Sequence, residues 1–134
     1  MKRLFFFVAI LVPWTAVPGA DPGEAPAVNP AFAPIEEVAG LPRVLLLGDS
    51  IPMGYTLPVR ELLKGKANVL RPPVNCSSTG NALESLDGWL GKGKWDLVHF
   101  NFGLHDAKLP PEGIRHSPPE VYEKNLRELV KKLK

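Results

Sequence analysis

A serine follows a glycine and an aspartate at the end of an apolar run, a position suited to nucleophilic chemistry. Residues 43–47 (RVLLL) form the run, and Gly48, Asp49 and Ser50 come directly after it. A serine between a strand and a helix lies near the helix N-terminus, where free N–H groups and the helix dipole stabilise an alkoxide and a neighbouring oxyanion. The same position suits a serine that only caps the helix. The sequence therefore leaves two interpretations of Ser50 open, a nucleophile and an N-cap.

Two further loops carry small residues that suit a ligand site. Residues 101–106 (NFGLHD) bring an imidazole, His105, next to a carboxylate, Asp106. Residues 75–81 (NCSSTGN) offer backbone N–H groups. Ligands of an open parallel sheet bind beyond the carboxyl ends of its strands, so we expect the loops to line one site with Ser50. Structural roles stay open as well, since His105 can simply bond Asp106 and the second loop can be a turn with an N-cap.

Short apolar strands alternate with helical segments along the rest of the chain. The continuous apolar run at residues 43–47 predicts a strand that is buried on both faces, and two further short runs predict strands. Apolar residues spaced three and four apart predict helices. The last helix follows Ser117-Pro118-Pro119-Glu120, which has the pattern of a capping box with proline in the first turn. This order predicts a parallel α/β sheet with helices on both faces, as the front part of a larger domain. The predicted strands are residues 43–47, 67–71 and 95–100, and the predicted helices are residues 59–64, 81–90 and a last helix ending at Leu133.

Taken together, these loops resemble the sequence blocks of the GDSL/SGNH hydrolases, exported serine esterases and lipases with a flavodoxin-like, three-layer α/β/α fold. The resemblance implies that Ser50 is the nucleophile and that its N–H belongs to the oxyanion hole. Two positions, Gly80 and Ser77, stay open for the second oxyanion donor. The third block is Gly-x-Asn-Asp in the family and GLHD at residues 103–106 here. His105 thus stands in place of the oxyanion asparagine, and an imidazole N–H can donate to an oxyanion as an amide does.

The resemblance covers residues 42–134 and implies catalysis through an acyl-enzyme. Ser50 attacks an ester carbonyl, water then releases the acid, and neither a metal nor an organic cofactor is needed. The expected substrate is a short acyl or O-acetyl ester, carried on a carbohydrate. Three polar neighbours of the predicted catalytic residues are expected to contact the substrate: Asp49, Asn101 and Asp106.

The general base of the family has no match in the sequence. The family takes it from an Asp-x-x-His motif after the last strand, but His116 has no carboxylate three residues before it. Asp96 and His99 have the right spacing on a predicted strand, where residues three apart point to opposite faces, so we interpret His99 as a core or strand-end histidine. We therefore expect a C-terminally truncated chain with little or no esterase activity. An unpaired sheet edge would also lower its stability.

Two other functions stay open beside an exported serine ester hydrolase. A non-catalytic exported module would keep the fold and bind acylated glycans in the same cleft, and the missing base together with His105 favours it. An acyltransferase would pass the acyl group to a sugar hydroxyl instead of water. The sequence cannot separate transfer from hydrolysis, because both reactions share the acyl-enzyme.

The N-terminus has the pattern of a secretory signal peptide. Lys2 and Arg3 precede an apolar run at residues 4–12, and small residues suited to cleavage follow at residues 16–20. The run is too short to span a bilayer, although an uncleaved anchor remains an alternative. Residues 21–41 are rich in proline and alanine and predict a linker, without fixed structure as far as Pro34. We expect an exported protein, periplasmic or extracellular, that is not inserted in the membrane after cleavage.

Composition excludes several other classes of protein. The 134 residues carry 16 Lys and Arg against 14 Asp and Glu, and no basic cluster with interleaved aromatic residues indicates a nucleic-acid surface. The single cysteine, Cys76, excludes an internal disulfide framework and a cysteine-based zinc cage. We expect Cys76 to be a small core residue.

Overall fold

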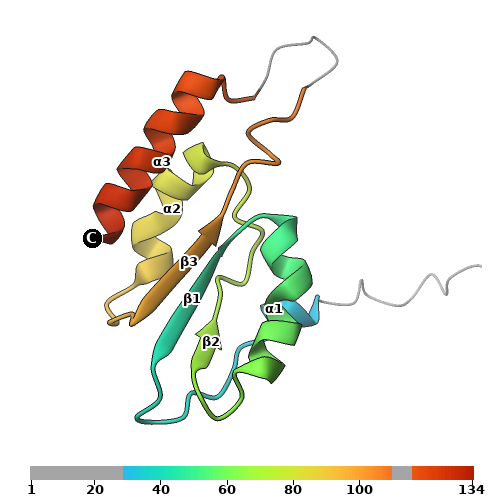
Figure 1. The fold of residues 1–134 in the computed structure, drawn as a ribbon, viewed down its shortest axis with the longest axis vertical. Coiled ribbons are helices and arrows are strands. Elements are labelled where there is room, and N and C mark those ends of the chain that lie inside the picture. The colour runs from blue at the N-terminus through green and yellow to red at the C-terminus, as the bar shows by residue number, and fades with distance from the viewer. Residues whose placement is uncertain (1–28, 110–115) are drawn as a thin grey trace, which may run out of the picture.

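The structure, a computed structural model, describes residues 29–109 and 116–134. Its centre is a sheet of three parallel strands, β1 (Arg43–Gly48), β2 (Asn68–Leu70) and β3 (Leu97–Asn101), in the order β2-β1-β3 (Figure 1). All three strands fall within or close to the predicted apolar runs. The prediction of a parallel α/β sheet is therefore confirmed.

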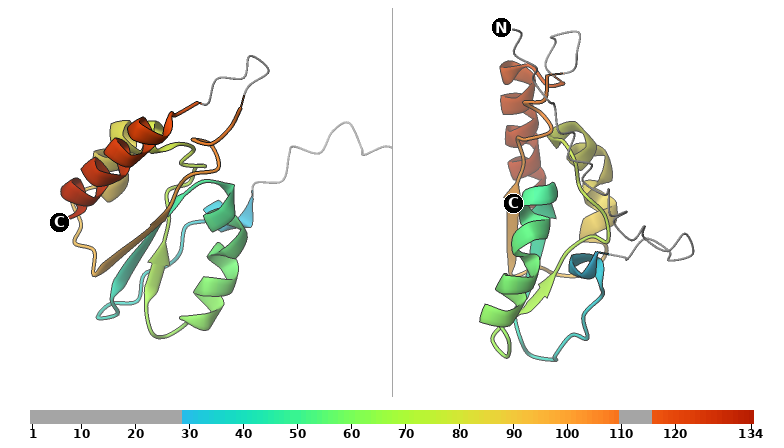
Figure 2. Two further views of the ribbon diagram at one scale, coloured as in Figure 1. Left: turned by 45° about the horizontal axis from the view of Figure 1, so that its top comes forward. Right: turned by 90° about the vertical axis from the view of Figure 1, so that its right-hand side faces the viewer.

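Helices cover both faces of the sheet and produce three layers (Figure 2). α1 (Ser50–Leu62) lies on one face, and α2 (Thr79–Leu90) and α3 (Pro119–Leu133) lie side by side on the other. The chain moves outward from β1 to β2 and then crosses back over β1 to β3, and right-handed crossovers in opposite directions place their helices on opposite faces. This strand order is that of a flavodoxin-like fold, as predicted.

The main core lies between β1 and the pair of helices α2 and α3. Leu45 and Leu47 point to this side of the sheet and pack with Leu86 and Leu129, all of them at most 2% exposed. Leu46 is also buried, and the alternation of the strand turns it toward the opposite face. Burial of each leucine contributes about 1.5–3 kcal/mol and fixes the central strand between the layers.

α1 begins much earlier than the predicted helix, which covered only residues 59–64. Asp49 is its N-cap, and the carboxylate of Asp49 accepts the N–H of the second helical residue at 2.9 Å. Pro52 lies in the first turn, where a missing N–H breaks no helical hydrogen bond. Pro58 does lie inside the helix, yet the helix continues past it to Leu62. Ser50 is therefore the first residue of a helix of 13 residues and not part of a long loop.

The start of α3 also differs from the prediction. Pro118 is the N-cap, and no side chain makes a capping hydrogen bond, so the proposed capping box is wrong. Ser117 is buried and instead donates its backbone N–H to the carbonyl oxygen of Asp106 at 3.0 Å. The predicted apolar stripe is confirmed at its centre by Leu129, which is 1% exposed.

Part of the predicted linker has a fixed structure. Residues Pro30–Phe32 form the short 3₁₀ helix η1 beside α1, and the Phe32 ring lies 5.1 Å from the guanidinium carbon of Arg71. The side chain of Asn68 donates to the carbonyl of Val38 and accepts from its N–H, both at 2.9 Å. These contacts correct the expectation of an unstructured segment for residues 29–34. The predicted signal peptide, residues 1–20, and the linker as far as residue 28 lie outside the described residues.

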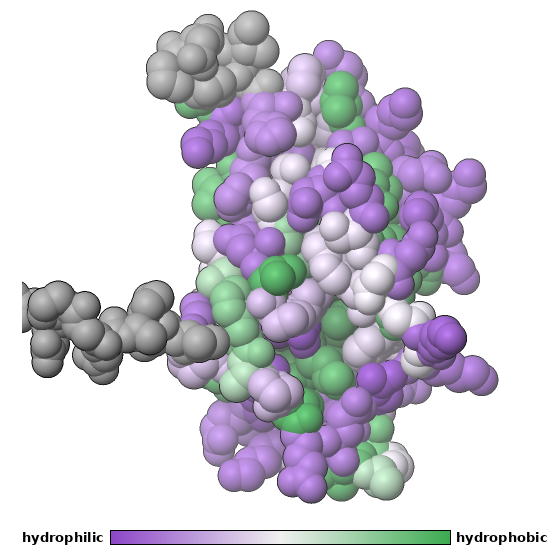
Figure 3. Space-filling view, turned by 180° about the vertical axis from the view of Figure 1, so that it is seen from behind, coloured by the Kyte–Doolittle hydropathy of each residue, from purple (hydrophilic) through white to green (hydrophobic). Residues whose placement is uncertain are grey.

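In the described part of the chain, the β3 edge of the sheet has no neighbouring strand, and the surface seen from behind is mainly hydrophilic. β3 pairs only with β1 here, so its outer edge has no strand beside it among residues 29–109 and 116–134. Leu97 on that strand is 53% exposed. Seen from behind, hydrophilic side chains cover most of the surface and hydrophobic ones appear in patches between them (Figure 3). No helix in the part of the chain that the structure describes has the length and apolar character to cross a membrane.

Candidate active site

Three segments meet at the carboxyl edge of the sheet. They are the end of β1 with the start of α1, the loop before α2, and the loop after β3 (Figure 1). The N–H of Cys76 donates to the carbonyl of Gly48 at 3.1 Å and joins the first two segments. The hydroxyl of Ser77 lies 3.4 Å from Nδ1 of His105 and joins the second to the third. The predicted convergence of the three loops is therefore confirmed.

Gly48 makes the sharp turn that presents Ser50. Its φ is +140°, and a Cβ atom at this position would lie 2.2 Å from the carbonyl oxygen of Asn101. Only glycine fits, because any side chain would collide with the neighbouring strand. Ser50 then begins α1 with an exposed side chain. Since Asp49 supplies the cap, the structure does not support the interpretation of Ser50 as an N-cap.

Asp49 holds the turn from inside and does not reach solvent. Its side chain is 0% exposed, and Oδ1 accepts the N–H of Ile51. Oδ2 is also buried and has no hydrogen-bond partner. In this structure the carboxylate is turned inward as the helix N-cap, and the expected contact of Asp49 with substrate stays a prediction.

Ser77 has the one positive φ, +59°, among the described residues other than glycine. Its N–H donates to Oδ1 of Asn75 at 2.9 Å, which closes a turn of the kind asparagine side chains form with the backbone two residues on. Gly80 lies in the first turn of α2 and its φ is not positive. Of the two positions considered for a second oxyanion donor, Ser77 is the one that lies beside His105.

Asp106 fixes the loop that carries His105. Its carboxylate is 2% exposed and accepts three hydrogen bonds from Thr79, two from the N–H at 3.0 and 3.2 Å and one from Oγ1 at 2.5 Å. Asn125 of α3 donates to the same Thr79 oxygen at 3.1 Å. In this structure the carboxylate is occupied by the start of α2, and the expected contact of Asp106 with substrate stays a prediction. The bonds of Asp106 also fix the position of the neighbouring residue, His105.

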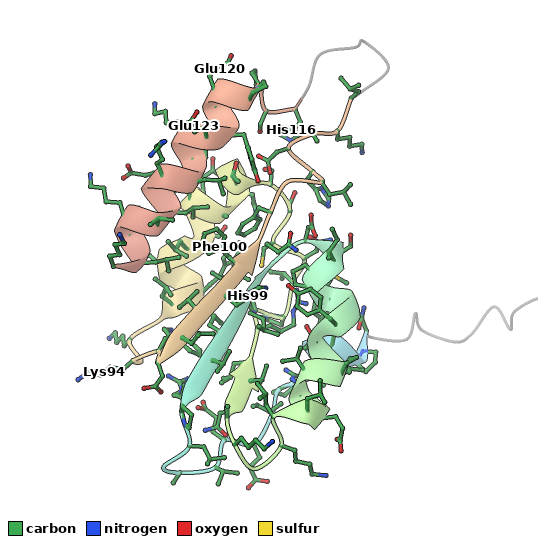
Figure 4. The ribbon with its side chains drawn as sticks, viewed as in Figure 1. Lys94, His99, Phe100, His116, Glu120 and Glu123 are labelled. Atoms are coloured by element: carbon green, nitrogen blue, oxygen red, sulfur yellow. The ribbon has the colours of Figure 1, made fainter. Side chains whose placement is uncertain are left out.

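His99 lies on β3 with an exposed side chain, so of the two roles that we expected, a core or a strand-end histidine, the core role is wrong (Figure 4). Its Nε2 is 2.8 Å from the hydroxyl of Tyr55, a residue of α1, and the two rings meet edge to face. Asn101, at the end of the same strand, is half-buried and hydrogen-bonds Tyr55. Burial raises the pKa of Tyr55, the charge of Asp49 acts in the same direction, and the hydrogen bond from Asn101 opposes both.

Two buried side chains support the loop before α2. Cys76 is 0% exposed, which confirms the prediction of a small core residue, and burial raises the pKa of its thiol. Arg71 donates to Thr56 Oγ1 and to the carbonyl of Val74, both at 3.1 Å. Nothing in the sequence pattern singled out Arg71, because its partners are mainly backbone carbonyls that only the fold brings near.

No imidazole bonds the candidate nucleophile within the described part of the chain. His99 bonds Tyr55, His105 lies against Ser77, and His116 lies beyond the sheet edge at the start of α3 (Figure 4). The same residues hold no cluster of three side chains that would ligate a metal ion. Ser50 is therefore a candidate nucleophile, and Ser77 and His105 are candidate donors, without a base hydrogen-bonded to Ser50 among the described residues.

Exposed apolar side chains lie next to two of these residues in the sequence. Ile51, next to Ser50, is 45% exposed, and Leu104, next to His105, is 57% exposed. Leu104, His105, Ala107 and Lys108 line an open depression. Such a surface suits an uncharged organic group better than a highly charged ligand.

Comparison with known proteins supports an esterase relationship at a distance. The chain is 29% identical over 103 residues to an arylesterase of Vibrio mimicus, an alignment that covers 69% of this chain and 48% of that protein. The chain thus spans about half the length of this curated relative. No protein-family model matches the chain.

Proposed function

We propose that this chain is part of a serine ester hydrolase of the GDSL/SGNH type, with Ser50 as the nucleophile. The observation that carries the proposal is the exposed Ser50 at the first position of α1, aimed by Gly48 and left free by the cap of Asp49. At this position the helix dipole and the free N–H groups of the first turn favour negative charge. The similarity to an arylesterase supports the same reaction class.

In the proposed reaction, Ser50 Oγ attacks the ester carbonyl carbon and the carbon–oxygen bond to the alcohol breaks. The serine proton passes to a base and then to the leaving alcohol, and water hydrolyses the acyl-enzyme in the reverse sequence of proton transfers. The backbone N–H of Ser50 and a ring N–H of His105 are the proposed oxyanion donors. The N–H of Ser77 joins them only when it leaves Asn75 Oδ1, which it binds in this structure.

The substrate we propose is an uncharged small-molecule ester with a short acyl group. The exposed side chains of Ile51, next to Ser50, and Leu104, next to His105, offer apolar contacts to such a substrate. An O-acetyl ester on an exported carbohydrate fits the same chemistry. Export itself is also a proposal, based on the pattern of residues 1–20, and N-terminal sequencing of the mature protein tests it.

A fluorophosphonate probe tests the nucleophile directly. With imidazole added as an external base, we expect the probe to label the chain at Ser50, located by mass spectrometry of the peptides, and to leave Ser50→Ala unlabelled. Ser85→Ala is the matched control, because Ser85 lies on α2 and not at the start of a helix, and it should label like the wild type. Labelling that persists in Ser50→Ala would refute the assignment.

A second function is favoured by one observation, the lack of any imidazole bonded to Ser50 among the described residues. A non-catalytic module would bind esters at this edge and leave them intact. In that case the probe does not react, while an acylated sugar still shifts the NMR signals of Leu104 and His105.

A further inference from the structure

The ring of His105 has a single side-chain partner within the described part of the chain. Oγ of Ser77 lies 3.4 Å from Nδ1. The backbone around the ring is fixed, because Ala107 N–H donates to the carbonyl of Gly103 at 2.8 Å and Asp106 is held by α2. The ring therefore faces Ser77 in a defined orientation.

Ser77 adopts a backbone conformation that glycine would adopt more easily. Its φ of +59° is in the left-handed region, which disfavours residues with a Cβ atom. The bond from its N–H to Asn75 Oδ1 holds that conformation in place. A glycine at position 77 would adopt this turn without strain. Compared with glycine, serine adds a hydroxyl group, and this hydroxyl lies against His105.

We propose that the Ser77 hydroxyl holds His105 in the neutral tautomer that carries its proton on Nε2. An unprotonated imidazole nitrogen accepts a hydrogen bond more strongly than a hydroxyl oxygen does, so the hydroxyl donates to Nδ1. A neutral imidazole has one N–H, which then lies on Nε2, because the partner of one ring nitrogen decides the state of the other.

The consequence for catalysis rests on the proposed function. With its proton on Nε2, His105 offers an N–H donor to an oxyanion. In the opposite tautomer Nε2 would present a lone pair and repel the same negative charge. Ser77 is thus a positioning residue, which acts on the reaction through His105 and not by touching the substrate.

Long-range ¹H–¹⁵N NMR on the labelled chain tests this assignment, since the shifts of Nδ1 and Nε2 report the tautomer. Variants His99→Gln and His116→Gln assign the remaining imidazole signals to His105. We expect Nε2–H in the wild type. In Ser77→Ala the ratio of Nε2–H to Nδ1–H should fall about fivefold, as expected for the loss of one hydrogen bond of ordinary net strength.

Two further variants separate the hydroxyl from the backbone. Ser77→Gly also removes the hydroxyl but relieves the positive φ, so it should fold at least as well as the wild type and still show the altered ratio. Ser85→Ala should leave the ratio unchanged. An Nδ1–H tautomer in the wild type, or an unchanged ratio in both Ser77 variants, would overturn the proposal. Neither result depends on whether Ser50 reacts, so failure of the tautomer assignment is distinguishable from failure of the esterase assignment.

Discussion

Asp106→Ala removes the acceptor that binds the loop after β3 to the start of α2. The carboxylate accepts three hydrogen bonds from Thr79, and both residues are at most 2% exposed. Water cannot replace the lost acceptor without opening the loop. Thr79 Oγ1 would keep its bond from Asn125, but the N–H of Thr79 would be left buried and unpaired.

The size of the effect follows from these contacts. Two buried donors, the N–H and the hydroxyl of Thr79, lose their acceptor. Each costs about 1–2 kcal/mol, in the lower half of the range for a buried donor without a partner. We therefore expect Asp106→Ala to lower the free energy of unfolding by about 2–4 kcal/mol, a large part of the 5–15 kcal/mol typical of a domain. Asp106→Asn keeps one acceptor oxygen and should fall between the variant and the wild type.

Urea unfolding followed by circular dichroism measures this loss as a lower midpoint at unchanged slope. Asp87→Ala is the matched control on α2, because its side chain is 83% exposed and contacts only Lys132 at 3.5 Å. That control should change the free energy by no more than about 0.5 kcal/mol. If the two alanine variants unfold at the same urea concentration, the anchoring role of Asp106 is refuted.

Two other predictions concern the turn before Ser50 and the buried ionisable groups. Gly48→Ala places a Cβ atom 2.2 Å from a backbone oxygen and should prevent folding or cost more than about 3 kcal/mol of stability. Gly54 lies on α1 with open space around it, so Gly54→Ala should stabilise the chain by about 0.5–1 kcal/mol. Thermal unfolding of both variants checks this contrast. Burial raises the pKa of both Cys76 and Tyr55, so the folded chain keeps protons that the unfolded chain releases. The stability that these protonated groups contribute should be fully present below about pH 8.5, and it should disappear as the pH rises through the pKa values of the folded chain. Urea titrations at increasing pH should show that decline, and a shallower one in Cys76→Ala; equal slopes would contradict the assigned cause.

The sheet was predictable because each strand is a short apolar run that ends at polar or small residues. Residues 43–47 have the pattern of a buried strand and residues 95–100 that of a further strand, and the alternation with helices leaves few topologies. The start of α1 was not predictable in the same way. Proline normally interrupts a helix, but Pro52 falls in the first turn and Pro58 is tolerated in a helix already fixed by packing.

Side-chain roles at the site were harder to predict than its location. Asp49 and Asp106 have the residue type of substrate ligands, yet both bind nearby backbone N–H groups, which are concentrated at helix starts. Which N–H groups need an acceptor depends on the residue at which each helix begins. Ser77 carried one usable signal, the asparagine two residues earlier that favours a turn. Its approach to His105 depends on the packing of two loops that are 28 residues apart in the sequence.

The central claim is that Ser50 forms an acyl-enzyme, and a single stopped-flow experiment with p-nitrophenyl acetate tests it most directly. We predict little release of p-nitrophenolate by the chain alone, because no base is bonded to Ser50 among the described residues. Added imidazole, serving as an external base, should speed both the release of p-nitrophenolate and the acetylation of Ser50, located by peptide mass spectrometry. Ser50→Ala should show no acceleration beyond the reaction of imidazole itself. Acetylation at another residue, or an equal acceleration in Ser50→Ala, would contradict the account.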